Sequence, residues 1–167
     1  MKFDQHLVSI KWSDYELLDS GENEKLERFG EVILRRPETQ ALWAKQKSAL
    51  WADAHATFTF ADKKGSWHMH KPVPDSWVVM RTGLPLIARL TGFKHTGIFP
   101  EQSSNWKWLS ERCRDVRRPD MPKVLNLFAY TGAATVTAAL AGASVTHVDA
   151  SKQSLDWAHE NARLSNI

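Results

Sequence analysis

The sequence predicts an α/β protein in which a small β-rich N-terminal domain precedes the start of a parallel, doubly wound sheet. Two strand–helix pairs follow one another near the C-terminal end of the 167 residues, in segments 124–141 and 144–164. Short runs of β-forming residues fill the N-terminal part instead. Alternating strands and helices are typical of a parallel sheet, whereas short strands bounded by turns are typical of an antiparallel one. We therefore divide the chain into domains 1–94 and 95–167.

The N-terminal domain contains five short segments that are rich in β-forming residues. They are Tyr15–Asp19, Val32–Arg35, Thr57–Phe60, Trp77–Arg81 and Leu86–Leu90. Turn-forming residues lie between them at 20–23, 62–65 and 82–85, and residues 39–51 predict a short helix or an irregular segment. Together these patterns predict a small antiparallel sheet of roughly four to six strands.

The C-terminal domain begins with a predicted helix over residues 102–116. Ser103 or Ser104 is expected to cap its start, because a serine hydroxyl accepts a hydrogen bond from a first-turn N–H. Trp106, Leu109 and Cys113 are spaced to share one face of this helix, which we expect to be buried. Pro119 and Pro122 then mark a connector to the next element.

Strand, helix, strand and helix follow this connector in order. The predicted elements are a buried strand Val124–Phe128, a helix Ala133–Ala141, a strand Ser144–Val148 and a helix Lys152–Leu164. Gly142 is placed to end the first of these helices, and Ser151 is placed to cap the second. This order is typical of the opening of a doubly wound parallel sheet.

Two features of this unit fall at the carboxyl edge of the predicted sheet, where open α/β sheets bind ligands. One is the small-residue loop 129–132, and the other is Asp149 at the end of the neighbouring strand. A glycine lets the backbone approach a ligand closely, and a carboxylate accepts hydrogen bonds from both hydroxyls of a ribose. The pair therefore predicts a nucleoside-binding edge.

The loop has one glycine and a bulky tyrosine, so it lacks the three-glycine pattern that wraps a pyrophosphate. S-adenosylmethionine (SAM) is a nucleoside without phosphate, and its amino-acid tail ends in a carboxylate. Backbone amides of this loop and the hydroxyl of Thr131 can hold such a carboxylate. The residues thus favour SAM over a dinucleotide.

The segment VLNLFAYTGAATVTAALAGASVTHVDASKQSLDWAHENARLSN resembles the first two motifs of class I SAM-dependent methyltransferases, which have a Rossmann-like fold. Within that class it is most similar to the bacterial 23S ribosomal-RNA (large-subunit) base methyltransferase family. HTGIFPEQSSNWKW at residues 95–108 resembles a segment that lies near the cofactor in that family. The N-terminal stretch LLDSGENEKLERFGEVILRRPETQALW resembles an extension found in one bacterial branch. The resemblance covers most of the chain.

The resemblance implies a set of cofactor-binding residues. The wall and loop around the methionine moiety are assigned to Phe128, Ala129, Tyr130, Thr131 and Gly132. Asp149 is expected to bind the ribose hydroxyls, Ala150 and Ser151 to border the adenine, and Gln102 and Pro100 to line the near side of the pocket. Each assignment has a structural alternative: core packing for Phe128 and Ala129, helix packing for Gly132, and a favourable acid at a helix N-terminus for Asp149.

The family's catalytic segment, an Asp-Pro-Pro type motif after a later strand, does not occur in this sequence. Cys113 precedes the first motif and does not match the catalytic cysteine of some relatives. We therefore assign no catalytic residue, and we expect a chain truncated after the second motif and inactive alone. Its two parallel strands are expected to leave an open edge and a bare apolar face, so that the chain is marginally stable or self-associates.

Charge and aromatic content bear on the partner. Residues 31–120 hold 15 Lys and Arg against 9 Asp and Glu, an excess that suits phosphates but also suits a solvated surface. Eight tryptophans suit either base stacking or the core of a small domain. Ribosomal RNA is the partner that the resemblance implies. The residues leave open an RNA-binding or assembly module without catalysis and a nucleotide-dependent oxidoreductase.

Metal, membrane and secretion signals are weak. His55, His68, His70 and His95 have no accompanying cysteine or carboxylate cluster, so we expect no metal site. No run of about 18 apolar residues predicts a membrane span. The N-terminus lacks the apolar run of a signal peptide, and the single cysteine excludes an intrachain disulfide. These features favour a cytoplasmic protein.

Overall fold

The computed structural model describes residues 12–61, 64–115 and 120–167. The chain divides into two units, which are described separately. Among the described residues, one unit comprises 12–82 and 87–96, and the other comprises 83–86 and 97–167. The boundary expected from sequence, between residues 94 and 95, falls just before the second unit resumes at Gly97. Within the described residues, no helix is long and apolar enough to cross a membrane.

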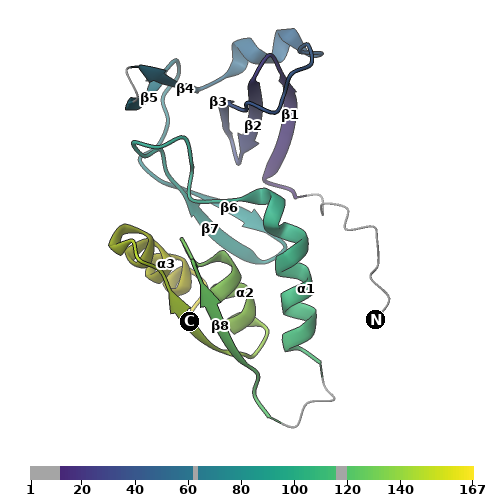
Figure 1. Ribbon diagram of the computed structural model, residues 1–167, viewed down its shortest axis with the longest axis vertical. Helices are drawn as coiled ribbons and strands as arrows, with labels where there is room; N and C mark the ends of the chain where they lie inside the picture. The colour runs from purple at the N-terminus through teal and green to yellow at the C-terminus, as the bar shows by residue number, and fades with distance from the viewer. Residues whose placement is uncertain (1–11, 62–63, 116–119) are drawn as a thin grey trace. The chain divides into compact units, whose positions relative to one another are not determined.

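The first unit is built on a five-stranded sheet in the order β1-β2-β3-β4-β5, labelled in Figure 1. Its strands are Tyr15–Gly21, Glu24–Phe29, Val32–Pro37, Ala56–Ala61 and Lys64–Met69. A short 3-10 helix, Ser48–Asp53, follows β3. Leu26, Trp51 and Ala54 form a buried cluster beside it, against which Leu18 and Ile33 pack. The β-rich domain predicted from sequence is therefore confirmed.

Two details of this sheet differ from the expectation. β3 and β4 pair in parallel, with Leu34 opposite Ala56, so the sheet is not wholly antiparallel. Strands β2 and β5 were not identified individually in the sequence, because charged or histidine residues interrupt their apolar pattern. Residues 39–51 are irregular up to the 3-10 turn that begins at Ser48, which agrees with the expected short helix or irregular segment.

β6 (Trp77–Arg81) and β7 (Leu84–Ala88) form a two-stranded sheet. The turn between its strands holds two residues, Thr82 and Gly83, both with positive φ. β7 begins two residues earlier than the predicted strand Leu86–Leu90. A two-residue turn with positive φ at both positions matches the twist of paired strands, which explains why the strand starts so soon after Gly83.

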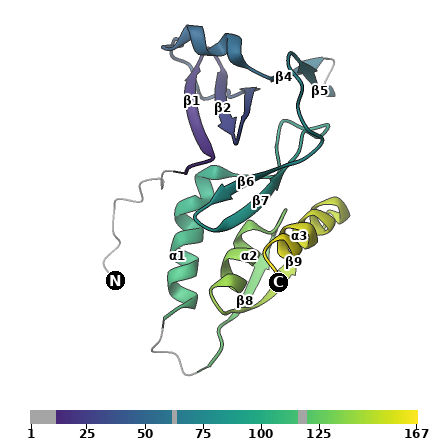
Figure 2. The ribbon, with the colours of Figure 1, turned by 180° about the vertical axis from the view of Figure 1, so that it is seen from behind.

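The second unit contains α1 (Ser103–Cys113), β8 (Lys123–Leu127), α2 (Ala133–Leu140), β9 (Ser144–Val148) and α3 (Lys152–Leu164). β8 and β9 pair in parallel, so the predicted strand–helix–strand–helix order is confirmed. α2 contacts both strands and both other helices, and the two ribbon views show it between α1 and α3 (Figures 1 and 2). Cys113, Ala138 and Ala141 form the buried cluster on this side of the strands, with Val124 and Val145 packed against it.

Helix starts show one correct and one wrong prediction. Ser151 caps α3 as expected, because its hydroxyl accepts a hydrogen bond from the N–H of Ser154 at 3.2 Å. Neither Ser103 nor Ser104 caps α1, whose N-cap residue is Gln102 with no side-chain cap bond. A 3-10 turn, Pro100–Gln102, runs directly into α1 and replaces the expected cap.

Candidate functional site

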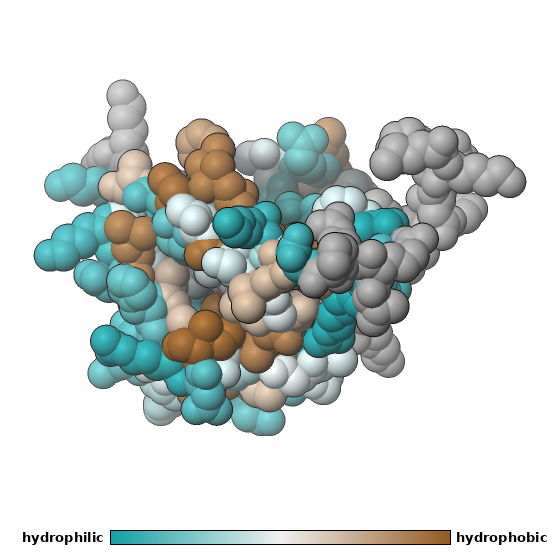
Figure 3. Space-filling view, turned by 90° about the horizontal axis from the view of Figure 1, so that it is seen from below, coloured by the Kyte–Doolittle hydropathy of each residue, from teal (hydrophilic) through white to brown (hydrophobic). Residues whose placement is uncertain are grey.

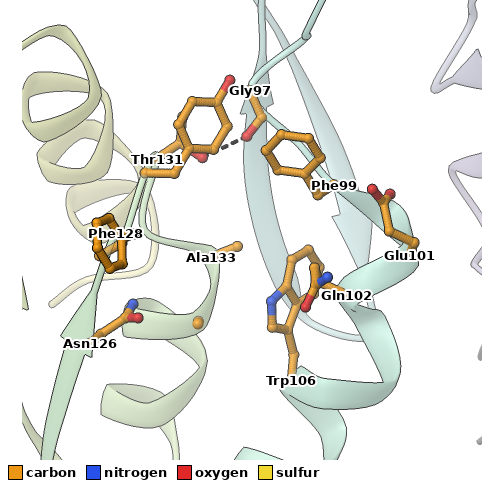
Figure 4. A pocket seen from close by; sticks show the side chains of 12 residues that line it. Gly97, Phe99, Glu101, Gln102, Trp106, Asn126, Phe128, Thr131 and Ala133 are labelled. Carbon is orange, nitrogen blue, oxygen red and sulfur yellow. Dashed lines mark hydrogen bonds between the residues drawn. The ribbon is translucent and has the colours of Figure 1, made fainter. Parts of the chain in front are cut away.

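A cavity of about 450 Å³ opens beside the carboxyl end of β8 (Figure 4). One wall comes from the segment that leads into α1 and from α1 itself, and the other comes from β8, the loop after it and the start of α2. The lining residues are Gly97, Phe99, Glu101, Gln102 and Trp106 on the first side, and Asn126, Phe128, Ala129, Tyr130, Thr131, Ala133 and Ala134 on the second. All belong to the second unit. Small-molecule sites typically have volumes of about 300–1,000 Å³.

The loop after β8 has a strained backbone. Phe128 and Tyr130 have positive φ values of 54° and 52°, a region that residues other than glycine rarely adopt. Phe128 is 93% exposed, so its ring is not core packing. Strain of this kind persists where surrounding contacts fix the backbone, and it is common at ligand sites.

Four hydrogen bonds fix this loop in place. The N–H of Ala129 donates to the carbonyl of Val148 at 3.1 Å, and the N–H of Tyr130 donates to Oδ2 of Asp149 at 2.8 Å. The amide of Asn161 on α3 donates to the Thr131 carbonyl at 2.8 Å. The Thr131 hydroxyl donates to the Gly97 carbonyl at 2.5 Å, drawn as a dashed line in Figure 4. The loop is therefore held from β9, α3 and the opposite wall.

The Thr131 hydroxyl, expected to bind a ligand carboxylate, forms a hydrogen bond within the protein. Its side chain is 2% exposed and its hydroxyl proton is already committed to Gly97, so it cannot also donate to a ligand carboxylate. This acceptor lies 34 residues earlier in the sequence, in a segment with no local signal for the bond. Thr131 instead joins the two walls.

The start of α2 offers the donors that Thr131 does not. Gly132 is the N-cap residue and supplies no side-chain cap. The first N–H groups of a helix lack intrahelical partners and carry the positive end of the helix dipole. Ala133 and Ala134, in this first turn, line the cavity with small side chains. A carboxylate is therefore a suitable ligand at this end of the cavity.

Gly132 is needed here for two independent reasons. Its φ is +86°, and a Cβ at this position would lie 2.9 Å from Cβ of Ala158 on α3. The helix-packing alternative and the site assignment are thus compatible, because close packing of α3 brings the loop to the cavity. Gly132 is buried and does not line the cavity itself.

Asp149 holds the end of β9 to the loop and to the start of α3. Its Oδ2 accepts from Tyr130 and its Oδ1 accepts from the N–H of Ser151 at 2.9 Å. These backbone hydrogen bonds, from Ser151 and then Tyr130, lower the pKa of the Asp149 carboxyl below its usual value. The group is therefore ionised at neutral pH, and the carboxylate can still accept a further hydrogen bond.

Not every residue assigned from the resemblance reaches the cavity. Phe128, Ala129, Tyr130, Thr131 and Gln102 line it, whereas Asp149, Ala150 and Ser151 lie outside its lining at the end of the neighbouring strand. Pro100 is buried at the start of the 3-10 turn. Gln102 accepts a hydrogen bond from Asn105, which orients its amide. The roles given to all ten residues stay predictions.

A polar group beneath the loop was missed in the sequence. Asn126 of β8 donates to the Thr135 hydroxyl at 2.9 Å, and that hydroxyl lies 2.8 Å from Nδ1 of His147. Burial is the main reason that the pKa of His147 is lowered, so its ring is neutral at pH 7. The available signal was that Asn126 and His147 are polar residues that alternate with Val124 and Val145 on the helix-facing sides of β8 and β9.

Two aromatic residues of the opposite wall were also missed. The ring of Phe99 lies 5.2 Å from that of Tyr130 at 49°, and Trp106 is 5% exposed at the base of the same wall. Figure 4 shows Phe99 and Trp106 on the wall across the cavity from Asn126 and Phe128. Trp106 was recognised only as part of a buried helix face.

The histidines considered as metal ligands have other partners. Nδ1 of His55 accepts from the N–H of Ile33, and the rings of His68 and His70 bond the hydroxyls of Thr59 and Thr57. In the part of the chain that the structure describes, no three His, Cys, Asp or Glu residues form a group that could hold a metal ion.

Comparison with known proteins gives no matching family model. Among curated proteins, the ribosomal RNA large subunit methyltransferase K/L of Shewanella oneidensis is 44% identical over 79 residues, which is 47% of this chain and 10% of that protein. Its counterpart from Pseudoalteromonas translucida is 40% identical over 91 residues, 54% of this chain and 12% of that protein. The chain thus spans about a tenth of the length of these curated relatives.

Solved structures match almost the whole chain. The SAM-dependent methyltransferase from Agrobacterium tumefaciens is 43% identical, with a TM-score of 0.88 over 95% of this chain and 50% of that one. A Streptococcus mutans protein with 19% identity has a TM-score of 0.70 over 95% of this chain and 44% of that one, which shows the fold alone. A third, with 18% identity and a TM-score of 0.69, was solved with S-adenosylhomocysteine (SAH) bound and covers the same shares. The chain has the methyltransferase fold, spans about half the length of these structures, and is related to the class I SAM-dependent methyltransferases that its motifs resemble.

Proposed function

We propose that this chain is the SAM-binding part of a methyltransferase that acts on a base in ribosomal RNA in the cytoplasm. The observation that carries the proposal is the cavity at the carboxyl edge of β8, with the α2 N-terminus at one end and the ionised Asp149 on the neighbouring strand. The 43% identity to a SAM-dependent methyltransferase over 95% of the chain supports it. The ribosomal RNA acceptor rests on the names of the curated relatives.

The residues present fit the parts of SAM. The uncapped first turn of α2, beside Ala133 and Ala134, suits the carboxylate of the methionine moiety. The remaining lone pairs of Asp149 suit the ribose hydroxyls, and Ala150 and Ser151 lie next to it for the adenine. Phe99 and Tyr130 supply an apolar wall between these ends. The described residues that line the cavity include no Lys or Arg for a pyrophosphate.

SAM supplies an electrophilic methyl group on its sulfonium when it is bound. This chain would bind and orient the cofactor, because positioning is the main contribution of a protein whose cofactor carries the chemistry. The fixed loop Phe128–Gly132 would set where the methionine moiety lies. We assign no residue of this chain to proton transfer or to orienting the acceptor base.

Titration with SAH tests the binding part of the proposal. We expect micromolar binding by calorimetry and no binding of NADH. Asp149→Ala is expected to weaken SAH binding by about 10- to 100-fold, because a hydrogen bond to a charged group is worth about 1.5–3 kcal/mol. Asp156→Ala, which removes an exposed aspartate on α3, is the matched control and is expected to bind as the parent chain does.

The outcomes separate the alternatives. Tight NADH binding would favour the nucleotide-dependent oxidoreductase. RNA binding by a folded chain that does not bind SAH would favour the RNA-binding or assembly module. Because Asp149 also holds Tyr130 and Ser151, the circular dichroism spectrum and thermal midpoint of Asp149→Ala must be compared with those of the parent chain.

We further propose that the chain self-associates through the face of β8 and β9 opposite the helices. Leu125, Leu127 and Val148 on that face are 63%, 54% and 43% exposed. Apolar side chains also reach the surface in the space-filling view of Figure 3. Exposed apolar patches favour association.

Sedimentation velocity is expected to show a concentration-dependent dimer. Leu125→Lys is expected to weaken this dimer, whereas Leu42→Lys, at a 78% exposed site of the other unit, is expected to leave it unchanged. A parent chain that stays monomeric at all concentrations would contradict this.

A further inference from the structure

A second cavity, of about 550 Å³, lies in the β-rich unit and has an unusual lining. Three phenylalanines and two lysines surround it, together with two glycines and a histidine: Phe58, Phe60, Phe93, Lys64, Lys94, Gly65, Gly92 and His95. All of these residues come from β4, β5 and the segment 92–95 of the same unit. The cavity is therefore separate from the candidate cofactor site.

Two of its aromatic rings are exposed rather than buried. Phe60 is 62% exposed and Phe93 is 69% exposed, whereas Phe58 is 2% exposed. The ring of Phe58 packs edge-on against the ring of Phe60, with centroids 5.2 Å apart at 84°. The buried Phe58 therefore supports the exposed Phe60 ring. Leaving two large apolar rings in water is unfavourable. Rings held at the surface in this way are suited to stacking on a planar ligand.

Glycine and hydrogen bonds build this surface. A Cβ at Gly65 would lie 2.0 Å from Cζ of Phe58, so only glycine lets that ring lie over β5. Nε1 of Trp67 donates to the Thr91 carbonyl at 2.9 Å, which ties the segment that carries Phe93 to β5. Arg36, in turn, donates to the carbonyl of Lys94 at 2.9 Å. Phe93 and Lys94 are thus presented on a fixed segment.

The described charged residues around the cavity are cations, and Asp62 and Lys63 between β4 and β5 lie outside the described residues. Strands β4 and β5 and the segment 87–96 contain Lys64, Arg89 and Lys94 but, among their described residues, no Asp or Glu. Several other cations of the unit are paired, as Arg35 and Lys45 are with Glu24 at 2.6 Å. Neither Lys64 nor Lys94 forms an ion pair with a described carboxylate. A polyanion therefore complements this face.

We propose that this cavity binds an unpaired nucleobase of single-stranded RNA, with the base stacked on Phe60 and Phe93 and the flanking phosphates beside Lys64 and Lys94. Exposed aromatic rings with neighbouring cations are the combination that holds single strands, because every base has a stacking face and every nucleotide a phosphate. A second copy of the chain would also cover the rings but would not account for the two lysines beside them. The inference deepens the proposed function, on which its choice of RNA rests, by giving the acceptor a contact outside the cofactor cavity.

Fluorescence anisotropy tests the proposal. The full chain is titrated, without SAM or SAH, into a labelled 12-nucleotide single-stranded RNA of mixed sequence. Phe93→Leu and Phe60→Leu are expected to weaken binding by about 5- to 100-fold, the loss typical of one stacked base. Phe93→Tyr keeps the ring and is expected to bind within about twofold of the parent. A 12-base-pair RNA duplex, whose bases are already stacked, is expected to bind more weakly than the single strand.

Salt dependence tests the lysines separately. Lys64→Gln and Lys94→Gln are each expected to reduce the slope of log affinity against log salt by about 0.7, the value for one phosphate contact on a single strand. Lys47→Gln is the matched control, since Lys47 is exposed in the same unit but lies outside the cavity. It is expected to leave both slope and affinity unchanged.

Three results would overturn the inference: no RNA binding, equal binding by parent and Phe93→Leu, or a self-association that Phe93→Leu abolishes while RNA binding persists. SAH binding is measured independently by calorimetry. A parent chain that binds SAH but no RNA therefore refutes this inference alone, whereas a parent chain that binds RNA but no SAH refutes the cofactor proposal.

Discussion

Replacing Gly97 by alanine is expected to lower the free energy of unfolding by about 2–5 kcal/mol, because two costs add at this position. Its φ is +89°, a region that costs a residue with a Cβ about 1–2 kcal/mol. The new Cβ would lie 2.2 Å from Cζ2 of Trp157, which is 3% exposed and cannot move without repacking α3. Overpacking of this kind costs about 1–3 kcal/mol.

The same substitution is expected to weaken SAH binding. The Gly97 carbonyl accepts the Thr131 hydroxyl, so displacing Gly97 loosens the bond that joins the two walls of the cavity. Gly142→Ala is the matched control, because Gly142 has nearly the same φ, +88°, but no atom within 4 Å of a Cβ built there. Urea denaturation of both variants followed by circular dichroism measures the difference. Equal losses of stability would show that Trp157 can yield and would contradict the packing described here.

Glu27→Ala is expected to destabilise the β-rich unit by about 3–5 kcal/mol, the cost of leaving a buried charge without its partner. Glu27 is 1% exposed and accepts from Nε of Arg36 at 2.8 Å and from the hydroxyl of Tyr15 at 2.9 Å. Arg36 is itself 4% exposed, so water cannot replace the lost carboxylate. Urea denaturation measures this loss.

Two further variants test the physical reason for this effect. Glu16→Ala removes a 56% exposed carboxylate 3.6 Å from Arg28, and its cost is expected to stay below about 1 kcal/mol. The double variant Glu27→Leu/Arg36→Met removes both buried charges and is expected to be more stable than Glu27→Ala. A double variant that is less stable than the single one would contradict the assignment of the loss to an unpaired guanidinium.

The parallel part of the fold was predictable because its signals are local. Ser144–Val148 and Lys152–Leu164 have the predicted bounds, and Ser151 caps α3 as expected. Apolar runs, a cap residue and a glycine at a helix end act within a few residues, so a sequence displays them directly. The approach of the loop after β8 to the end of β9 followed from the rule for parallel sheets.

Contacts between distant segments were not predictable. The β2 segment EKLERF has no apolar alternation, because a charged residue, Glu27, occupies a buried position. Its burial depends on the ion pair with Arg36 on the next strand, which the local sequence does not show. The parallel pairing of β3 with β4 depends on how the intervening chain returns, which no local pattern specifies. The Thr131–Gly97 bond and the group of Asn126, Thr135 and His147 are likewise visible only after folding.

Hydrogen exchange of the backbone amides with and without SAH tests the central claim, that the cavity beside β8 binds the cofactor. SAH is expected to slow exchange in residues 128–135, where the loop and the first turn of α2 line the cavity, and in residues 149–151. Exchange in β1–β5 is expected to stay unchanged, because those strands belong to the other unit. Protection confined to β1–β5, or none at a concentration of SAH that saturates binding, would contradict the account.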